Sequence, residues 1–477
     1  MNYSIVIYLI GTLLQFQAAF LLLPALIGLL YREEEGYVYL IVAAITFLAG
    51  LLFKSRKPEV QKIRTREGIV ITGVGWISLS LIGAIPLFLC GHTENFTDAV
   101  FEIASGFTTT GASVLSNLES MPRCMMFWRS FTHWIGGMGV LVFLLAVLPS
   151  NADGMHIMRA ESPGPNVDKL VPRVRQTAFI LYAMYMILTL AEFLLLILGQ
   201  MPVFDAACLT FGTAGTGGFG VRSDSVVSYN SFCQVVITVF MVLFGVNFKL
   251  YYLIYAGKLK EAFKQEEVQG YLIIYAAAVI LISVDLYLQI GSVGDSIKHA
   301  AFQAASVMTT TGFATADFDK WHTLPKVIMV CLMFVGACAG STGGGVKVSR
   351  ILLYVKQVRR EVLSFVHPKS VKKIRLDGKG VSEETIRTTN AYLMVYGLVA
   401  FVSLILISLD GFDFTTSFTA VLATLNNIGP GLGAVGPMGS FAGFSAFSKW
   451  VFIFDMIAGR LEIFPILILF NRLTWKK

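Results

Sequence analysis

The chain has 477 residues, of which 55% are hydrophobic and 14% are charged, and its mean hydropathy is +0.70. Soluble domains carry about a quarter charged residues, so this composition excludes an ordinary soluble protein and indicates one that lies in a lipid bilayer. The formal net charge of +7 lies mostly in short loops beside apolar segments, which predicts contact with anionic membrane lipid and no nucleic-acid partner.

Ten apolar segments are close to the length of about 20 residues that crosses the hydrocarbon core of a membrane. The first is too long for the core of a signal peptide and lacks a cleavage site of small residues, so we expect it to remain as a membrane helix. The ten segments are 4–30, 37–53, 69–90, 127–148, 178–198, 232–255, 271–290, 327–354, 391–409 and 450–470.

Four shorter apolar segments alternate with the later spans, at 96–107, 204–213, 296–308 and 414–425. They cannot cross a membrane and therefore predict re-entrant helices. Each leads into a polar stretch that ends in glycine, and the near-equal intervals between these stretches indicate a fourfold internal repeat. The stretches are Thr108-Thr109-Thr110-Gly111, Gly215-Thr216-Gly217-Gly218, Thr309-Thr310-Thr311-Gly312 and Asn426-Asn427-Ile428-Gly429.

The expected fold is an all-α membrane protein with four pseudo-symmetric repeats around one pore, each made of a span, a re-entrant half-helix, a glycine loop and a second span. Two extra transmembrane helices, at residues 1–66, precede the repeats, which we place at residues 67–160, 174–260, 266–360 and 385–477. The connections at 54–66, 159–175, 258–264 and 359–379 are basic. Basic loops face the cytoplasm, so both termini are predicted there and the glycine loops open from outside.

The four glycine loops carry the predicted chemistry. Irregular backbone at membrane depth is tolerated only when it is buried in protein or lines a cavity, and glycine brings carbonyl oxygens close to an axis. A ring of carbonyls can replace the water around a monovalent cation, and the carbonyl ends of the half-helices favour a cation as well. Few carboxylates lie nearby, which disfavours a divalent site. Tight packing turns are the alternative, and fourfold recurrence weighs against it.

The glycine-rich run 336–345 lies in the middle of a segment, 326–360, that is too long for one unbroken span. It predicts a non-helical loop below the four glycine loops, while close helix packing through small residues is the alternative. The segment 340–347 resembles a phosphate-binding motif, but Val346 stands at the lysine position; 431–436 fits a dinucleotide pattern but follows no strand. Neither predicts a nucleotide site, and nothing in the sequence indicates an enzyme.

Charged residues inside predicted helices are few. Arg460 in the last span is expected either to act as a fixed positive charge near the pore or to pair with Glu462 or a carbonyl of the 336–345 loop. Arg129 and His133 lie one turn apart on one helix and are expected to neighbour Glu102 in a structural anchor.

The glycine loops, the 336–345 run and the Gly459-Arg460-Leu461-Glu462-Ile463-Phe464-Pro465 run together resemble the Trk/Ktr/HKT superfamily of potassium transporters, with the bacterial TrkH type as the nearest match. The resemblance extends over essentially the whole chain. It implies a bacterial inner-membrane protein for potassium uptake, in which glycine rather than serine at Gly111 goes with potassium preference. Channel-like flow is favoured, and a proton- or sodium-coupled symporter is the alternative.

The resemblance also implies particular residues and partners. Potassium is the transported ligand, no cofactor is expected in this chain, and the partners are a second copy and a cytoplasmic nucleotide-binding subunit of the TrkA type. The basic segment 359–379 is expected either to dock that subunit or only to set topology. The gate residues would be Gly336, Gly340, Ser341, Thr342, Gly343, Gly344, Gly345 and Arg460. The potassium filter would be Thr109, Thr110, Gly111, Thr216, Gly217, Gly218, Thr310, Thr311, Gly312, Asn427, Ile428 and Gly429, with the ion at Thr110, Gly111, Gly217, Gly218, Thr311, Gly312, Ile428 and Gly429.

Overall fold

The computed structural model describes residues 1–55, 58, 63–139, 174–367 and 373–476. Apart from one antiparallel pair of short strands, β1 (Arg375–Leu376) and β2 (Lys379–Gly380), the regular structure in these residues is helical. Six helices are long and apolar enough to cross a membrane, and they confirm the predictions of an all-helical membrane protein and of the corresponding six spans. These helices are α1 (Tyr3–Tyr31), α2 (Glu35–Lys54), α3 (Thr65–Leu89), α8 (Val174–Leu198), α13 (Glu266–Ile290) and α17 (Glu383–Ile407).

The four predicted short helices are also present, as α4 (Phe96–Phe107), α9 (Val203–Gly215), α14 (Val293–Met308) and α18 (Phe414–Leu425). Three of them begin where a polar side chain accepts a hydrogen bond from the backbone N–H three residues on, as Asn95 does from Asp98. A long helix, a short helix, a loop and a further helix therefore follow one another four times. The further helices are α5 (Arg123–Gly137), α10 (Ser231–Phe244), α15 (Thr323–Val335) and α19 (Ala446–Arg460).

These further helices are shorter than the sequence predicted. The expected span 232–255 is wrong as a single helix, because α10 and α11 (Phe248–Tyr255) meet at an angle of 89°. The expected span 450–470 is likewise divided into α19 and α20 (Phe464–Phe470). The span 327–354 is interrupted at 336–347, as the glycine-rich run predicted, and resumes as α16 (Val348–Val366). The end of the span 127–148 and parts of the basic connections lie outside the described residues.

The breaks have physical causes that apolar length does not reveal. At the α10–α11 break, loop 336–347 supplies the missing partners: the hydroxyl of Thr342 donates to the Phe244 carbonyl at 3.2 Å, and Phe248 N–H donates to the Gly340 carbonyl at 3.1 Å. Between α19 and α20 the backbone turns through positive φ at Glu462 and Ile463, and Pro465, which has no N–H, stands in the first turn of α20.

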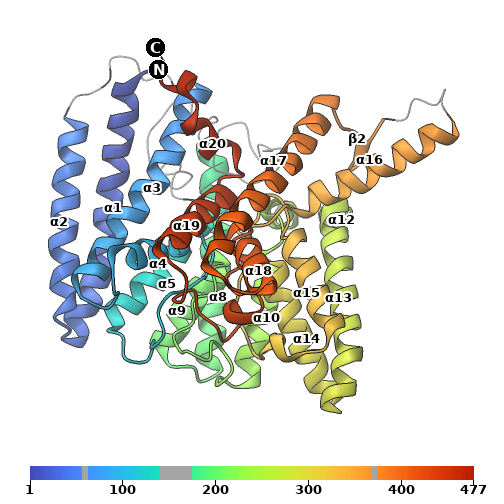
Figure 1. Cartoon of the computed structure of the whole chain (residues 1–477), viewed down its shortest axis with the longest axis horizontal. Helices are drawn as coiled ribbons and strands as arrows, with labels where there is room; N and C mark the ends of the chain where they lie inside the picture. Colours follow the sequence, from blue (N-terminus) through green and yellow to red (C-terminus); the bar gives the residue numbers. More distant parts are fainter. Residues whose placement is uncertain (56–57, 59–62, 140–173, 368–372, 477) are drawn as a thin grey trace.

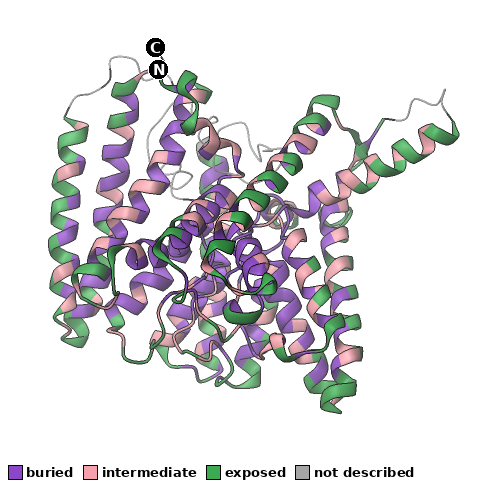
Figure 2. Cartoon of the chain, in the orientation of Figure 1, coloured by how far each residue is buried: buried purple, intermediate pink, exposed green. Residues whose placement is uncertain are grey.

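The chain ends lie side by side at one end of the molecule, with α1, α2 and α3 along one edge and α13 at the opposite edge (Figure 1). Buried residues gather in the centre, and the outer helices carry exposed residues on their outer faces (Figure 2). On α2, for example, Ile45, Leu48 and Leu52 are exposed. A helix of this length with an exposed apolar face suits hydrocarbon. The remaining short helices are α12 (Leu259–Phe263) and the single-turn segments Phe318–Lys320, Ser408–Asp410, Gly433–Val435 and Arg472–Trp475.

The turn between α1 and α2 stabilises the start of α5. Both oxygens of Glu33 accept hydrogen bonds there, from Arg123 N–H at 2.7 Å and from Cys124 N–H at 2.9 Å. Because such caps satisfy free N–H groups and favour negative charge at a helix start, Glu33→Ala should reduce stability by about 1 kcal/mol. Thermal unfolding in detergent measures the change. Glu34→Ala is the control, since that exposed side chain makes no cap; equal effects of the two substitutions would contradict the assignment.

Candidate ion site

The four glycine loops meet in a closed ring. Each glycine lies against the carbonyl oxygen of the residue that precedes the glycine of the next loop, and the fourth returns to the first. A Cβ atom added to any of the four glycines would overlap or crowd that oxygen. The distances from such a Cβ to the oxygen are 2.0 Å for Gly111 to Gly217, 1.9 Å for Gly218 to Thr311, 2.3 Å for Gly312 to Ile428 and 2.8 Å for Gly429 to Thr110.

All four loops follow the same backbone path. The glycine has positive φ, and so does the residue two positions before it, while the residue between them does not. The first of these positions is occupied by Thr109, Thr216, Thr310 and Asn427, with φ between 54° and 60°. In the second loop this pattern falls on Thr216 and Gly218, so Gly218 and not Gly217 corresponds to the other three glycines. Glycine is required there twice over, by its φ and by the adjacent carbonyl.

The loop 336–347 lies directly against two of the glycine loops. Gly344 N–H donates to the hydroxyl of Thr310 at 2.6 Å. A Cβ on Gly343 would lie 2.8 Å from the Thr309 carbonyl, and one on Gly344 would lie 2.4 Å from the Asn426 carbonyl. Small residues are therefore needed where this loop faces the ring.

Arg460 lies at the end of α19 and is almost fully buried. Its guanidinium donates to the Thr342 carbonyl at 2.8 Å and to the Gly137 carbonyl at 2.7 Å. It thus joins the loop 336–347 to the end of α5. One of the predicted alternatives was that Arg460 pairs with a carbonyl of this loop, and the structure has that contact. The other predicted partner, Glu462, is paired with Arg350 instead.

Two residues at this loop were missed from the sequence. The buried ammonium group of Lys347 donates to the Gly343 carbonyl, and Glu267 at the start of α13 accepts from Ala339 N–H at 2.6 Å and from Ser349 N–H at 3.2 Å. A lysine at the edge of an intramembrane glycine run was a usable signal, because charges at such depth require a partner. Nothing in the sequence around Glu267 connects it with a loop some 70 residues away.

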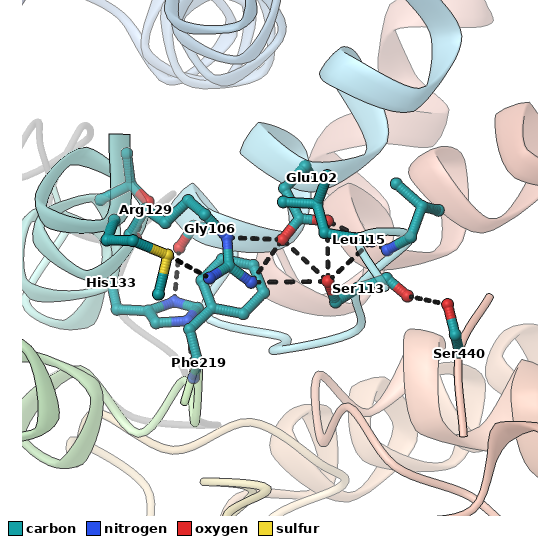
Figure 3. Close-up of polar contacts among 11 residues, drawn as sticks. Glu102, Gly106, Ser113, Leu115, Arg129, His133, Phe219 and Ser440 are labelled. Atoms are coloured by element: carbon teal, nitrogen blue, oxygen red, sulfur yellow. Dashed lines mark hydrogen bonds and ion pairs between the residues drawn. The ribbon is translucent and has the colours of Figure 1, made fainter. Parts of the chain in front are cut away.

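A buried ion pair supports the first glycine loop (Figure 3). Arg129 on α5 and Glu102 on α4 are 2.6 Å apart and both lie out of solvent, as the sequence predicted. Glu102 also accepts hydrogen bonds from the Ser113 hydroxyl at 3.0 Å and from Val114 N–H at 3.0 Å, just beyond Gly111. His133, expected beside Glu102, bonds instead to the Gly106 carbonyl at 2.9 Å.

The outer connections of the first two repeats are joined as well. Glu119 accepts from Ser223 N–H at 2.8 Å and from the Ser223 hydroxyl at 2.6 Å. These two hydrogen bonds favour the ionised carboxylate and hold the pKa of Glu119 below its usual value.

The ring contains four backbone carbonyl oxygens, each beside a glycine of the neighbouring loop. Within the described residues, no group of three or more His, Cys, Asp or Glu side chains is arranged to hold a metal ion. A site of this kind suits a weakly held monovalent cation that enters and leaves. Apolar helices of spanning length around such a ring define a membrane transport protein.

Comparison with known proteins identifies the family. The family model described as "TrkH: Cation transport protein" matches residues 36–475, and the chain belongs to this family, as the resemblance predicted. The family is one of transport proteins and not of enzymes. The chain is 35% identical to the Trk system potassium uptake protein TrkH of Salmonella typhimurium, with both chains covered completely. It is 34% identical to the Trk system potassium uptake protein TrkG of Escherichia coli, over 99% of this chain and 98% of that protein. A crystal structure of the potassium transporter TrkH from Vibrio parahaemolyticus matches with a TM-score of 0.90 at 32% identity, covering 100% of each chain.

The ion pair beside the first glycine loop should be essential to stability. Arg129→Met leaves Glu102 buried without its cation, and the loss of one partner from a buried pair costs about 3–5 kcal/mol. We therefore expect a large drop in the thermal unfolding temperature in detergent. The double variant Arg129→Met with Glu102→Gln, in which no net charge remains, should recover part of that loss; a double variant less stable than Arg129→Met would contradict this account.

Proposed function

We propose that this chain takes up potassium across a bacterial inner membrane, and that the ion passes through the ring of four glycine loops. The closed cycle of glycine-to-carbonyl contacts is the observation that carries the proposal. The names of the relatives support it, since they are potassium uptake proteins with which this chain aligns from end to end. An inside-negative potential contributes about 2.3 kcal/mol per charge per 100 mV, which suffices to drive channel-like flow.

In this proposal the four repeats surround one pore, at residues 67–160, 174–260, 266–360 and 385–477, after two extra helices. Oxygen atoms of the loops replace the water of the ion, while the basic connections and both termini face the cytoplasm. The filter comprises three residues from each loop, with potassium held at the last two. These residues are Thr109, Thr110 and Gly111, then Thr216, Gly217 and Gly218, then Thr310, Thr311 and Gly312, and finally Asn427, Ile428 and Gly429.

The loop 336–347 is proposed as the gate. It contacts the ring through Gly343 and Gly344, and it forms hydrogen bonds with the backbone at the break between α10 and α11. Arg460 holds the Thr342 carbonyl and adds a positive charge near the path of the ion. Movement of this loop away from Thr310 would open the path.

Helix α16 follows the gate loop directly and points away from the body of the molecule (Figure 1). Its apolar side chains Val358, Val362 and Phe365 line, with Leu393 and Met394 of α17, a groove of about 420 Å³. We propose that α16 and the basic segment after it receive a cytoplasmic nucleotide-binding subunit of the TrkA type, which would act on the gate through α16. A homodimer completes the proposed assembly.

A coupled symporter is the second candidate, and one observation favours it. Glu192 on α8 is completely buried, and neither of its carboxyl oxygens has a hydrogen-bond partner among the described residues. A lone carboxyl at this depth must be neutral or bind a cation. Reversal potentials in proteoliposomes under opposed potassium and proton gradients distinguish channel flow from coupling.

The ring predicts which glycine substitutions reduce rubidium flux most. Gly218→Ala and Gly111→Ala, whose new methyl groups would overlap a carbonyl, should reduce rubidium flux into proteoliposomes at least about tenfold, equivalent to about 1.4 kcal/mol, whereas Gly429→Ala should be the mildest of the four. Gly91→Ala is the control, because Gly91 also has positive φ but faces open space. The proposal fails if Gly91→Ala impairs flux as severely as Gly218→Ala.

The proposed gate predicts an opposite effect at Thr310. Thr310→Val keeps the shape of the side chain but removes the acceptor of Gly344 N–H, which costs the closed loop about 1–3 kcal/mol. Rubidium flux should therefore rise. Thr109→Val is the matched control, since Thr109 has the same backbone conformation and its buried hydroxyl has no partner in the described part of the chain. Unchanged or lower flux in Thr310→Val alone would contradict the role of the loop as gate.

A further inference from the structure

The second glycine loop differs from the others at one position. The residue before the last glycine is Thr110, Thr311 and Ile428 in the first, third and fourth loops, but Gly217 in the second. The φ of Gly217 is not positive, so its conformation does not require glycine. Something else must account for the missing side chain.

The imidazole ring of His133 occupies the place of that side chain. A Cβ on Gly217 would lie 2.2 Å from Nδ1, 2.3 Å from Cγ and 2.5 Å from Cε1 of His133. His133 is completely buried, and a Cβ on Gly215 would lie 2.2 Å from the backbone carbonyl oxygen of His133. Because atoms this close cannot coexist, the position of the His133 ring requires glycine at 217.

His133 also bonds to the backbone on both sides of it. Nδ1 donates to the Gly106 carbonyl of α4 at 2.9 Å, since a carbonyl can only accept, and Nε2 accepts from Phe219 N–H at 3.3 Å. These two bonds select the neutral ring with its proton on Nδ1. The rings of His133 and Phe219 lie 4.2 Å apart between centroids, and the Arg129 guanidinium lies 4.1 Å from the centroid of the Phe219 ring (Figure 3).

The next repeat lacks this arrangement. A Cβ on Gly137, which ends α5, would lie 2.6 Å from Gly215, and one on Gly245, just after α10, would lie 2.8 Å from Thr309. The contacted residues, Gly215 and Thr309, each stand three residues before a ring glycine. Gly137 and Gly245 therefore occupy corresponding positions in the two repeats. Four residues before each stand His133 and Met241, and Met241 is also completely buried. At these two corresponding positions the second loop has His133 and Gly217, whereas the third has Met241 and Thr311.

We propose that His133 is a positioning residue for the second loop and that it contributes to the discrimination of potassium from sodium. The inference rests on the proposed function, because it assigns the Gly217 carbonyl to the filter. A glycine without a side chain is free to turn its carbonyl, and a filter selects by the placement of its carbonyls. The imidazole restricts that freedom by volume and by its bond to Phe219 N–H.

The test is a cycle of four proteins: the unmodified chain, Gly217→Thr, His133→Met, and the double variant that reproduces the methionine and threonine of the third repeat. Each is reconstituted in liposomes, and rubidium influx is measured with potassium or sodium as competitor. Gly217→Thr should lose at least about tenfold in flux, equivalent to about 1.4 kcal/mol, from the clash. His133→Met should conduct but discriminate less well against sodium.

The double variant decides the matter. It should recover flux relative to Gly217→Thr and selectivity relative to His133→Met, which a residue that only stabilises the fold would not produce. Additive losses in the double variant, or its failure to fold when His133→Met folds, would overturn the inference. If the unmodified chain itself shows no preference for potassium, or Gly218→Ala has no effect, the proposed function fails instead.

Discussion

The structure depends on one constraint: irregular backbone in the middle of a membrane protein must find partners within the protein, because lipid offers none. The four glycine loops, the loop 336–347 and the breaks between α10 and α11 and between α19 and α20 are such backbone. The polar groups of these segments form hydrogen bonds with one another. The loop 336–347 donates through the Thr342 hydroxyl to the Phe244 carbonyl and through Gly344 N–H to the Thr310 hydroxyl. Arg460 donates to carbonyls of both this loop and the end of α5. The proposed pore and its gate are therefore parts of one polar network.

The four loops share a backbone path but are supported differently. In the first and third loops two threonine hydroxyls bond to each other, Thr108 to Thr110 at 2.8 Å and Thr309 to Thr311 at 2.7 Å. In the fourth, Asn427 donates to the Thr110 hydroxyl at 3.0 Å and to the Met456 carbonyl. The second has His133 in place of a side chain. The loops are thus supported in three different ways, so their shared backbone path does not require exact fourfold symmetry of sequence.

The elements that could be predicted from sequence are those set by local composition. Apolar length gave the six long helices, and the short helices α4 and α18 begin and end where the pattern indicated. The glycine loops were found through their recurrence. The break after Phe244 was not, because it lies in apolar sequence and is stabilised by a loop distant in the chain. The break after Arg460 was not found either, although Pro465 is a local signal for it. The contacts of Glu267 and the position of His133 also depend on residues distant in the chain, so only the structure reveals them.

Charge around the gate loop sets its energetics. Lys347, Arg350 and Arg460 lie within or beside the loop, and the carboxylates that face them are Glu462 and Glu267. Glu462 is bound to Arg350, and Glu267 is bound to backbone N–H groups. Lys347 donates to the Gly343 carbonyl of the loop, and Arg460 donates to the Thr342 carbonyl of the loop and to the Gly137 carbonyl of α5. Carbonyls are weaker partners for a buried cation than carboxylates are. The loop proposed as the gate is therefore held at Gly343 and Thr342 by hydrogen bonds that are weaker than an ion pair such as that of Arg350 with Glu462.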